Sequence, residues 1–165
     1  MGQEQAAQHH AGAMNDALRL IEHFERATCE DPLQAHRNAY GVLAIGYGHT
    51  AGAMEGQAIT REHADGLAIS DLESLYAQID ALLAPTAKRE MSENMRQAVA
   101  SFAHSIGINS FKETTILRRL NARLYAEVPK EMAKFNHFEL RELLVLKRRR
   151  EAEGALFCSF PNWLK

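Results

Sequence analysis

The sequence has few cysteines and no long apolar run. Its two cysteines, Cys29 and Cys158, have neither metal-ligand spacing nor the number that a disulfide framework needs, so free thiols are expected. No metal or other cofactor is expected.

Apolar residues form 46% of the chain, yet no run of them approaches the roughly 18 residues that cross a bilayer. Residues 1–12 also lack the apolar core of a signal peptide. The sequence therefore predicts a protein made in the cytoplasm without a membrane span.

The chain also lacks an excess of charge of one sign. Its formal net charge is −2, so it has no overall basic field of the kind that drives nucleic-acid binding. The one local run of cations, Lys147 to Arg150, is expected to be a solvated helix face. Nucleic acid is therefore not an expected partner. A helical regulatory or nucleic-acid-binding domain that uses this run remains an alternative.

A length of 165 residues indicates one folded unit with one core, and a monomer is expected. Residues 1–13 are small and polar, which predicts a flexible tail followed by one domain over 14–165.

Asn15 or Asp16 can cap a first helix that ends near Arg26. Its apolar positions recur at helical spacing, at Ala17, Leu20, Ile21 and Phe24.

Further helices follow over most of the chain. Thr60 is expected to cap a second helix that stops before Pro85, and Ser92 a third that ends at Gly107. Shorter helices are expected over 114–124 and 130–136, and a last one over 138–153, with Gly154 beyond it. The segment from Tyr40 to Gly48 mixes β-formers with three glycines and predicts a short hairpin, the only β region expected. The fold class is mainly α (α+β).

Several strings are more specific than periodicity. They are I-E-H-F-E at 21–25, G-V-L-A-I-G-Y-G-H-T at 41–50, I-T at 59–60, Q-A-V-A-S-F-A at 97–103, I-G at 106–107, T-T-I-L-R at 114–118, L-N at 120–121 and R-R-E-A-E at 149–153. In this order they resemble the phage-type lysozymes, glycoside hydrolase family 24, over about residues 17–158. The resemblance implies a small β-hairpin lobe, a larger helical lobe and a cleft between them. It also implies hydrolysis of the β-1,4 bond between N-acetylmuramic acid and N-acetylglucosamine.

Glu25 matches the general acid of this family. It lies at the edge of the apolar face of the first helix, where a carboxyl can be half desolvated. Desolvation favours the neutral form, and a protonated carboxyl can donate its proton to a glycosidic oxygen. Arg26 replaces the glycine that usually follows, and a cation so near Glu25 is expected to favour the carboxylate and to weaken the acid.

The two other catalytic positions of the family hold different residues. An aspartate that acts on the attacking water corresponds to Asn38, and a threonine that positions this water corresponds to Ala44. Asn38 can orient a water but cannot take its proton, and Ala44 has no polar group. The segment between Glu25 and Asn38 is longer than the family's pattern, so Glu30 or Asp31 stays open as a substitute base.

The resemblance also assigns residues around the cleft. It implies that Tyr47, Phe111 and Thr114 lie along the substrate site, with a core aromatic and a helix cap as the equally weighted alternative for Phe111 and Thr114. It further implies a structural pair between His49, in the hairpin string, and Asp71, on the following helix.

Two functional hypotheses result. The first is a muramidase that acts on peptidoglycan glycan strands at the bacterial cell wall, after release or delivery from the cytoplasm. The second, based on Asn38, Ala44 and Arg26, is a catalytically inactive lysozyme-fold module that binds peptidoglycan or a partner protein.

Overall fold

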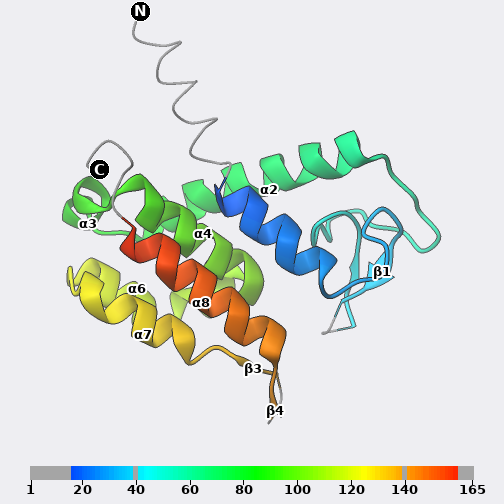
Figure 1. The fold of residues 1–165 in the computed structure, drawn as a ribbon. Helices are drawn as coiled ribbons and strands as arrows, with labels where there is room; N and C mark the ends of the chain where they lie inside the picture. Colours follow the sequence, from blue (N-terminus) through cyan, green and yellow to red (C-terminus); the bar gives the residue numbers. More distant parts are fainter. Residues whose placement is uncertain (1–15, 39–40, 139–140, 160–165) are drawn as a thin grey trace, which may run out of the picture.

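The protein consists of a first helix, a small hairpin region and then a bundle of helices (Figure 1). The computed structural model describes residues 16–38, 41–138 and 141–159. A first helix over 16–26 leads into the hairpin of β1 (His36–Arg37) and β2 (Leu43–Ala44), and the long helix α2 (Arg61–Leu82) follows. The expected 1–13 tail lies outside the described residues. None of the described helices combines the length and apolar composition that a bilayer crossing requires.

The remaining elements build the helical part. They are α3 (Pro85–Glu90), α4 (Glu93–Ile106), α5 (Ile108–Lys112), α6 (Thr115–Asn121), the 3₁₀ turn η1 (Tyr125–Glu127), α7 (Val128–Ala133), β3 (His137–Phe138), β4 (Arg141–Glu142) and α8 (Leu144–Cys158). Helix α4 packs against α8 and α2, and α7 packs against α8. The mainly α fold with a small β region is confirmed.

The helix boundaries follow local capping chemistry. The hydroxyl oxygens of Thr60 and Ser92 accept hydrogen bonds from backbone N–H groups in the first turns of α2 and α4, each at 3.2 Å. Thr114 caps α6 in the same way, at 3.2 Å. Gly107 ends α4 with a φ of 83°, a conformation that only glycine adopts without strain. These predicted starts and stops are confirmed.

The predicted hairpin is confirmed as a β region, but its first strand lies earlier than expected. β1 precedes Tyr40 and pairs antiparallel with β2, with His36 opposite Ala44 and Arg37 opposite Leu43. Most of the glycine-rich segment forms instead a tight turn, in which Ile45 and His49 exchange backbone hydrogen bonds of 2.8 and 3.0 Å. Two-residue strands leave no alternating pattern in the sequence, which is why their position was not predicted.

The last helix was predicted six residues too early at its start. Phe138 belongs to β3, which pairs with β4 in a second small sheet that the sequence analysis missed. α8 runs from Leu144 to Cys158 and passes through Gly154 without ending. At Gly154 a side chain would meet Pro129 Cβ at 3.5 Å. That distance is an ordinary van der Waals contact, so the packing of α7 on α8 does not require a glycine here, and Gly154 is not a helix stop.

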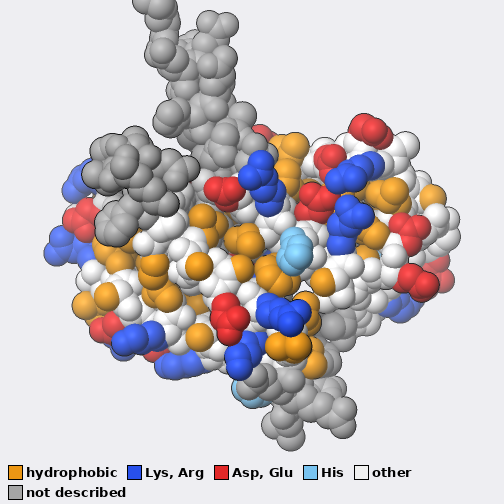
Figure 2. Space-filling view, viewed as in Figure 1, with side chains coloured by type: hydrophobic (Ala, Val, Ile, Leu, Met, Phe, Trp, Pro, Cys, Tyr) orange, Lys and Arg blue, Asp and Glu red, His pale blue; other side chains and the backbone are white. Residues whose placement is uncertain are grey.

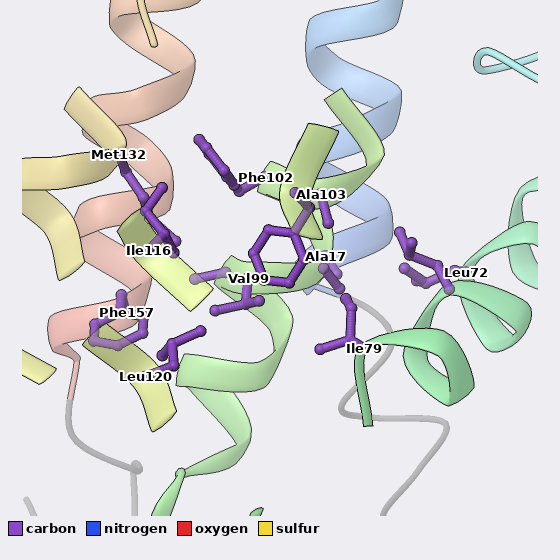
Figure 3. Close-up of a cluster of buried hydrophobic side chains, with 14 of the residues drawn as sticks. Ala17, Leu72, Ile79, Val99, Phe102, Ala103, Ile116, Leu120, Met132 and Phe157 are labelled. Atoms are coloured by element: carbon purple, nitrogen blue, oxygen red, sulfur yellow. The ribbon is translucent and has the colours of Figure 1, made fainter. Parts of the chain in front are cut away.

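One apolar core fills the space between the helices (Figure 3). Phe102 of α4 is fully buried at its centre, and its ring meets Phe111 and Phe135 edge-on at centroid distances of 6.4 and 5.1 Å. Ala17 and Ile21 bring the first helix onto this core. The side chain that follows on the edge of that helix face, Glu25, is thereby held beside the helical part.

Two cations of the 147–150 run are buried, so the prediction of a solvated face is wrong for half of it. Arg149 and Arg150 are 4% and 2% exposed, and both pair with the fully buried Glu153 at 3.2 and 3.0 Å. The Ser101 hydroxyl of α4 donates to the same carboxylate at 2.7 Å. On the face shown in Figure 2, the remaining acidic and basic side chains are interspersed. The buried group of Arg149, Arg150 and Glu153 on α8 is thus joined to α4 through Ser101.

Removing the shared acid of this group should destabilise the fold. Glu153→Ala removes the carboxylate that the buried Arg149 and Arg150 share, while Arg149 keeps its ion pair with Glu25. Removing one partner of a buried ion pair typically costs roughly 3–5 kcal/mol in the free energy of unfolding. Glu151→Ala, an exposed glutamate of the same helix, should change it by less than about 0.5 kcal/mol. Urea unfolding followed by circular dichroism measures both. Equal effects of the two substitutions would contradict the role assigned to Glu153.

Candidate active site

A hollow of about 580 Å³ lies where the end of the first helix, the β1–β2 hairpin, α4, β3 and the start of α8 meet. Glu25, His104 and Arg149 line one side of it, and Asn38 and Ala44 border it from the hairpin. The structure therefore brings together the three residues that the sequence analysis predicted at the catalytic positions. Besides Ala44, the apolar part of its lining consists of Ile106, Phe135, Leu143, Val145 and Leu146.

Glu25 is held at the edge of the hollow by one of its two oxygens. Its side chain is 22% exposed, and Oε1 accepts a hydrogen bond from Nη1 of Arg149 at 3.0 Å. His104 Nδ1 lies 3.8 Å from the same oxygen. None of the described residues makes a hydrogen bond or ion pair with Oε2. The carboxyl is thus fixed through Oε1 while Oε2 is left for another partner.

The cation next to Glu25 is not the predicted one. Arg26 turns to Glu22, at 3.2 Å, because successive side chains on a helix point about 100° apart. Arg149 takes the place that was expected for Arg26. Its Nε binds Glu153 at 3.2 Å and its Nη2 donates to the Ser101 carbonyl at 3.2 Å, so the guanidinium is fixed on three sides.

His104 is a site residue that the sequence analysis missed. It lies on α4, its side chain is 14% exposed, and its buried Nδ1 has no hydrogen-bond partner among the described residues. Burial lowers the pKa of His104, and the nearby Arg149 guanidinium lowers it further, against the opposing charges of Glu25 and Asp71. The imidazole is therefore neutral near neutral pH. In the sequence, His104 follows Ala100 by four residues, which places both on the same side of the helix. The structure buries Ala100, so this spacing could have indicated that His104 is partly buried.

Gly48 allows the hairpin to approach this pair closely. Its φ is 96°, and a Cβ there would stand 3.1 Å from Cε1 of His104 and 3.7 Å from the carboxyl carbon of Glu25. Any larger residue would be strained in its backbone and would press on the His104 ring. The glycine therefore allows the hairpin backbone to lie close to Glu25 and His104.

Asn38 and Ala44 form the hairpin side of the hollow. Oδ1 of Asn38 accepts a hydrogen bond from the Val42 N–H at 3.0 Å, and the backbone N–H of Asn38 donates to the Val42 carbonyl at 2.9 Å. Asn38 thus helps to close the β1–β2 turn. Ala44 is fully buried. As expected from their chemistry, neither can take a proton from water.

The two loop acids that stayed open as substitute bases do not line the hollow. Glu30 and Asp31 are both exposed, and Oδ1 of Asp31 accepts from the Leu33 N–H at 2.9 Å in a local turn. The structure therefore places neither of them opposite Glu25.

The three residues expected along the substrate site lie elsewhere in the structure. Tyr47 is 3% exposed and its hydroxyl points to Glu22 at 3.5 Å; burial raises the pKa of Tyr47 to about 12. Phe111 is fully buried in the core, and Thr114 caps α6. None of them lines the hollow. The placement of Phe111 and Thr114 agrees with the alternative of a core aromatic and a helix cap, because buried side chains offer almost no surface to a sugar.

A second hollow, of about 460 Å³, adjoins the first and shares Asn38, Gly48 and His104 with it. His49 and Asp71 border it. Nδ1 of His49 lies 2.8 Å from Oδ2 of Asp71, and Nε2 lies 2.8 Å from the Ala51 carbonyl. The predicted pair is confirmed and ties the hairpin to α2. Together the two hollows outline an extended groove between the hairpin and the helical part.

Both thiols are free, as predicted: Cys29 is half-buried and Cys158 is exposed. Burial raises the pKa of Cys29, and the charges of Glu25 and Asp31 raise it further. The thiol is therefore not activated. Within the described residues no group of three or more acid, histidine or cysteine side chains is arranged to hold a metal ion.

Comparisons with known proteins agree with this architecture. The family model of the phage lysozymes matches residues 27–153. The endolysin of Acyrthosiphon pisum secondary endosymbiont phage 1 is 33% identical over 144 residues, which cover 85% of this chain and 93% of that protein. The solved muramidase domain of SpmX from Asticaccaulis excentricus is 32% identical, with a TM-score of 0.75 over 87% of this chain and 95% of that one. A mutant lysozyme of phage P22 is 28% identical, with a TM-score of 0.67 over 86% of this chain and 96% of that one. The chain belongs to the phage lysozyme family.

Proposed function

We propose that this protein is a muramidase: it cleaves the β-1,4 bond between N-acetylmuramic acid and N-acetylglucosamine in peptidoglycan, with Glu25 as the general acid. Membership of the phage lysozyme family supports the substrate and the bond. The observation that carries the proposal for this chain is the half-buried Glu25 carboxyl, fixed beside the groove through one oxygen. Its place of action would be the bacterial cell wall.

The arrangement around Glu25 fits proton donation from Oε2. Oε1 accepts from the Arg149 guanidinium, which has no proton to lose at physiological pH, so a proton on the carboxyl resides on Oε2. The guanidinium lies where it stabilises the negative charge that forms on the carboxyl when the proton leaves. When the C1–O4 bond of the sugar breaks, O4 takes this proton, and Arg149 stabilises the charge left on Glu25.

A second candidate is a module that binds glycan strands without cleaving them. It is favoured by Asn38 and Ala44, which cannot accept a proton from the attacking water. The groove itself would serve binding as well as cleavage. The two candidates differ in one measurable property, the release of glycan fragments that depends on Glu25.

The test compares the protein with Glu25→Gln on purified peptidoglycan. Loss of the proton donor should lower the rate of turbidity decrease by about 10²–10⁴-fold, because general acid catalysis typically contributes that much. Glu30→Gln, an exposed glutamate outside the groove, should leave the rate unchanged. Sedimentation with insoluble peptidoglycan should show that Glu25→Gln still binds.

Equal and negligible release by the protein and by Glu25→Gln would reject the muramidase. Binding to insoluble peptidoglycan in that case would establish the non-catalytic module.

A further inference from the structure

The hairpin side of the hollow also carries an imidazole, that of His36. His36 lies on β1 directly opposite Ala44 on β2, and both line the hollow that contains Glu25. Residues paired in this way point to the same face of a sheet, with their Cβ atoms about 5 Å apart. The His36 ring therefore stands next to the position where the family carries its water-positioning threonine.

The hydrogen bonding of His36 determines which ring nitrogen is bare. Nδ1 lies 3.0 Å from the backbone carbonyl oxygen of Gln34. A carbonyl oxygen only accepts hydrogen bonds, so Nδ1 carries the proton, and Nε2 of the neutral ring is an acceptor. A neutral imidazole with a fixed tautomer and a bare nitrogen is the usual form of a histidine general base.

We propose that His36 is the general base of the glycan cleavage, in place of the carboxylate that Asn38 lacks; this rests on the proposed muramidase function. In the step, the oxygen of a water forms a bond to C1 while the C1–O4 bond breaks. Nε2 of His36 takes one proton from the water, and O4 takes the proton of Glu25. The imidazolium then releases its proton to solvent and Glu25 takes one up, which restores both groups without any other reactant.

His104 and Arg37, which also line the hollow, are less suited to this role. An inverting glycosidase holds its base about 6.5–9.5 Å from its acid, so that a water fits on the opposite face of the sugar. Nδ1 of His104 is only 3.8 Å from Glu25, which places this ring on the side of the acid. Arg37 is paired with Glu55 and cannot accept a proton. Glu25 is the only carboxyl among the described side chains that line this hollow.

The charges around His36 come from several elements. Besides His36 itself, the titratable and charged side chains described in the hollow are Glu25, Arg37, His104, His137 and Arg149. The two guanidinium groups are each paired with an acid, Arg37 with Glu55 and Arg149 with Glu25 and Glu153.

The first experiment compares His36→Gln with His63→Gln. Glutamine can still donate to the Gln34 carbonyl but cannot take a proton from water. On soluble glycan strands, His36→Gln should lower kcat by about 10²–10⁴-fold with little change in KM. His63 is exposed on α2 and outside both hollows, so His63→Gln should match the unmodified protein. An unchanged kcat in His36→Gln would overturn the proposal.

A second experiment restores the family's carboxylate in the variant without the imidazole. Adding Asn38→Asp and Ala44→Thr to His36→Gln should recover kcat. The acid-side limb of the pH profile should also move to lower pH than in the unmodified protein, because carboxylates titrate about two pH units below imidazoles. No recovery, in a variant that unfolds at an unchanged temperature, would show that His36 acts through structure and would overturn its role as base.

The stereochemistry of the product gives an independent test. Attack by water from the face opposite Glu25 should give the α-anomer at the new reducing end, observable by NMR in fresh digests. Retention of the β-anomer, or a product that contains no added water, would overturn the proposal while leaving the muramidase function intact. Absence of any cleavage above that of Glu25→Gln would overturn both.

Discussion

The site depends on the hydrogen bonds that the Arg149 guanidinium donates. It donates to Glu25 of the first helix, to Glu153 of its own helix and to the Ser101 carbonyl of α4. A buried cation is tolerated only when its donors are satisfied, so these three elements must meet for the fold to form. The position of the acid is therefore set by a residue 124 positions later in the chain. A local change in the first helix would not move Glu25 far as long as this contact persists.

The features predicted from the sequence are those that depend on neighbouring residues. Caps at Thr60 and Ser92 and the stop at Gly107 are local hydrogen-bonding and backbone preferences, and all three were correct. The burial of Arg149 and Arg150 was not predicted, because four consecutive cations on a helix resemble a solvated face. A signal was present: Glu153 follows them at the spacings that pair side chains on a helix, and those pairs form inside the protein.

The hairpin side of the site was predictable in composition but not in geometry. The glycines at 46 and 48 indicated a turn, and Gly48 indeed allows close approach to Glu25 and His104. The pairing of His36 with Ala44 could not be read from the sequence, since strands of two residues carry no alternation and a shift of one position would turn His36 to the other face. The placement of His104 and His36 was therefore missed for the same reason: only the folded structure brings them to the hollow that Glu25 lines.

At Asn38, where the family carries an aspartate, the side chain can fill the structural role of the turn but cannot take a proton from water. The bond from the Val42 N–H to Oδ1 needs only an oxygen acceptor, and the oxygens of amides and carboxylates supply it equally. Substituting aspartate by asparagine thus keeps the turn and the shape of the groove while it removes a negative charge opposite the acid. In the proposed cleavage, a positive charge that develops at C1 of the sugar would face less stabilisation from this wall. In the proposed cleavage the attacking water would lie between the hairpin and the sugar, so the group that takes its proton would come from the same wall, where β1 carries the His36 imidazole.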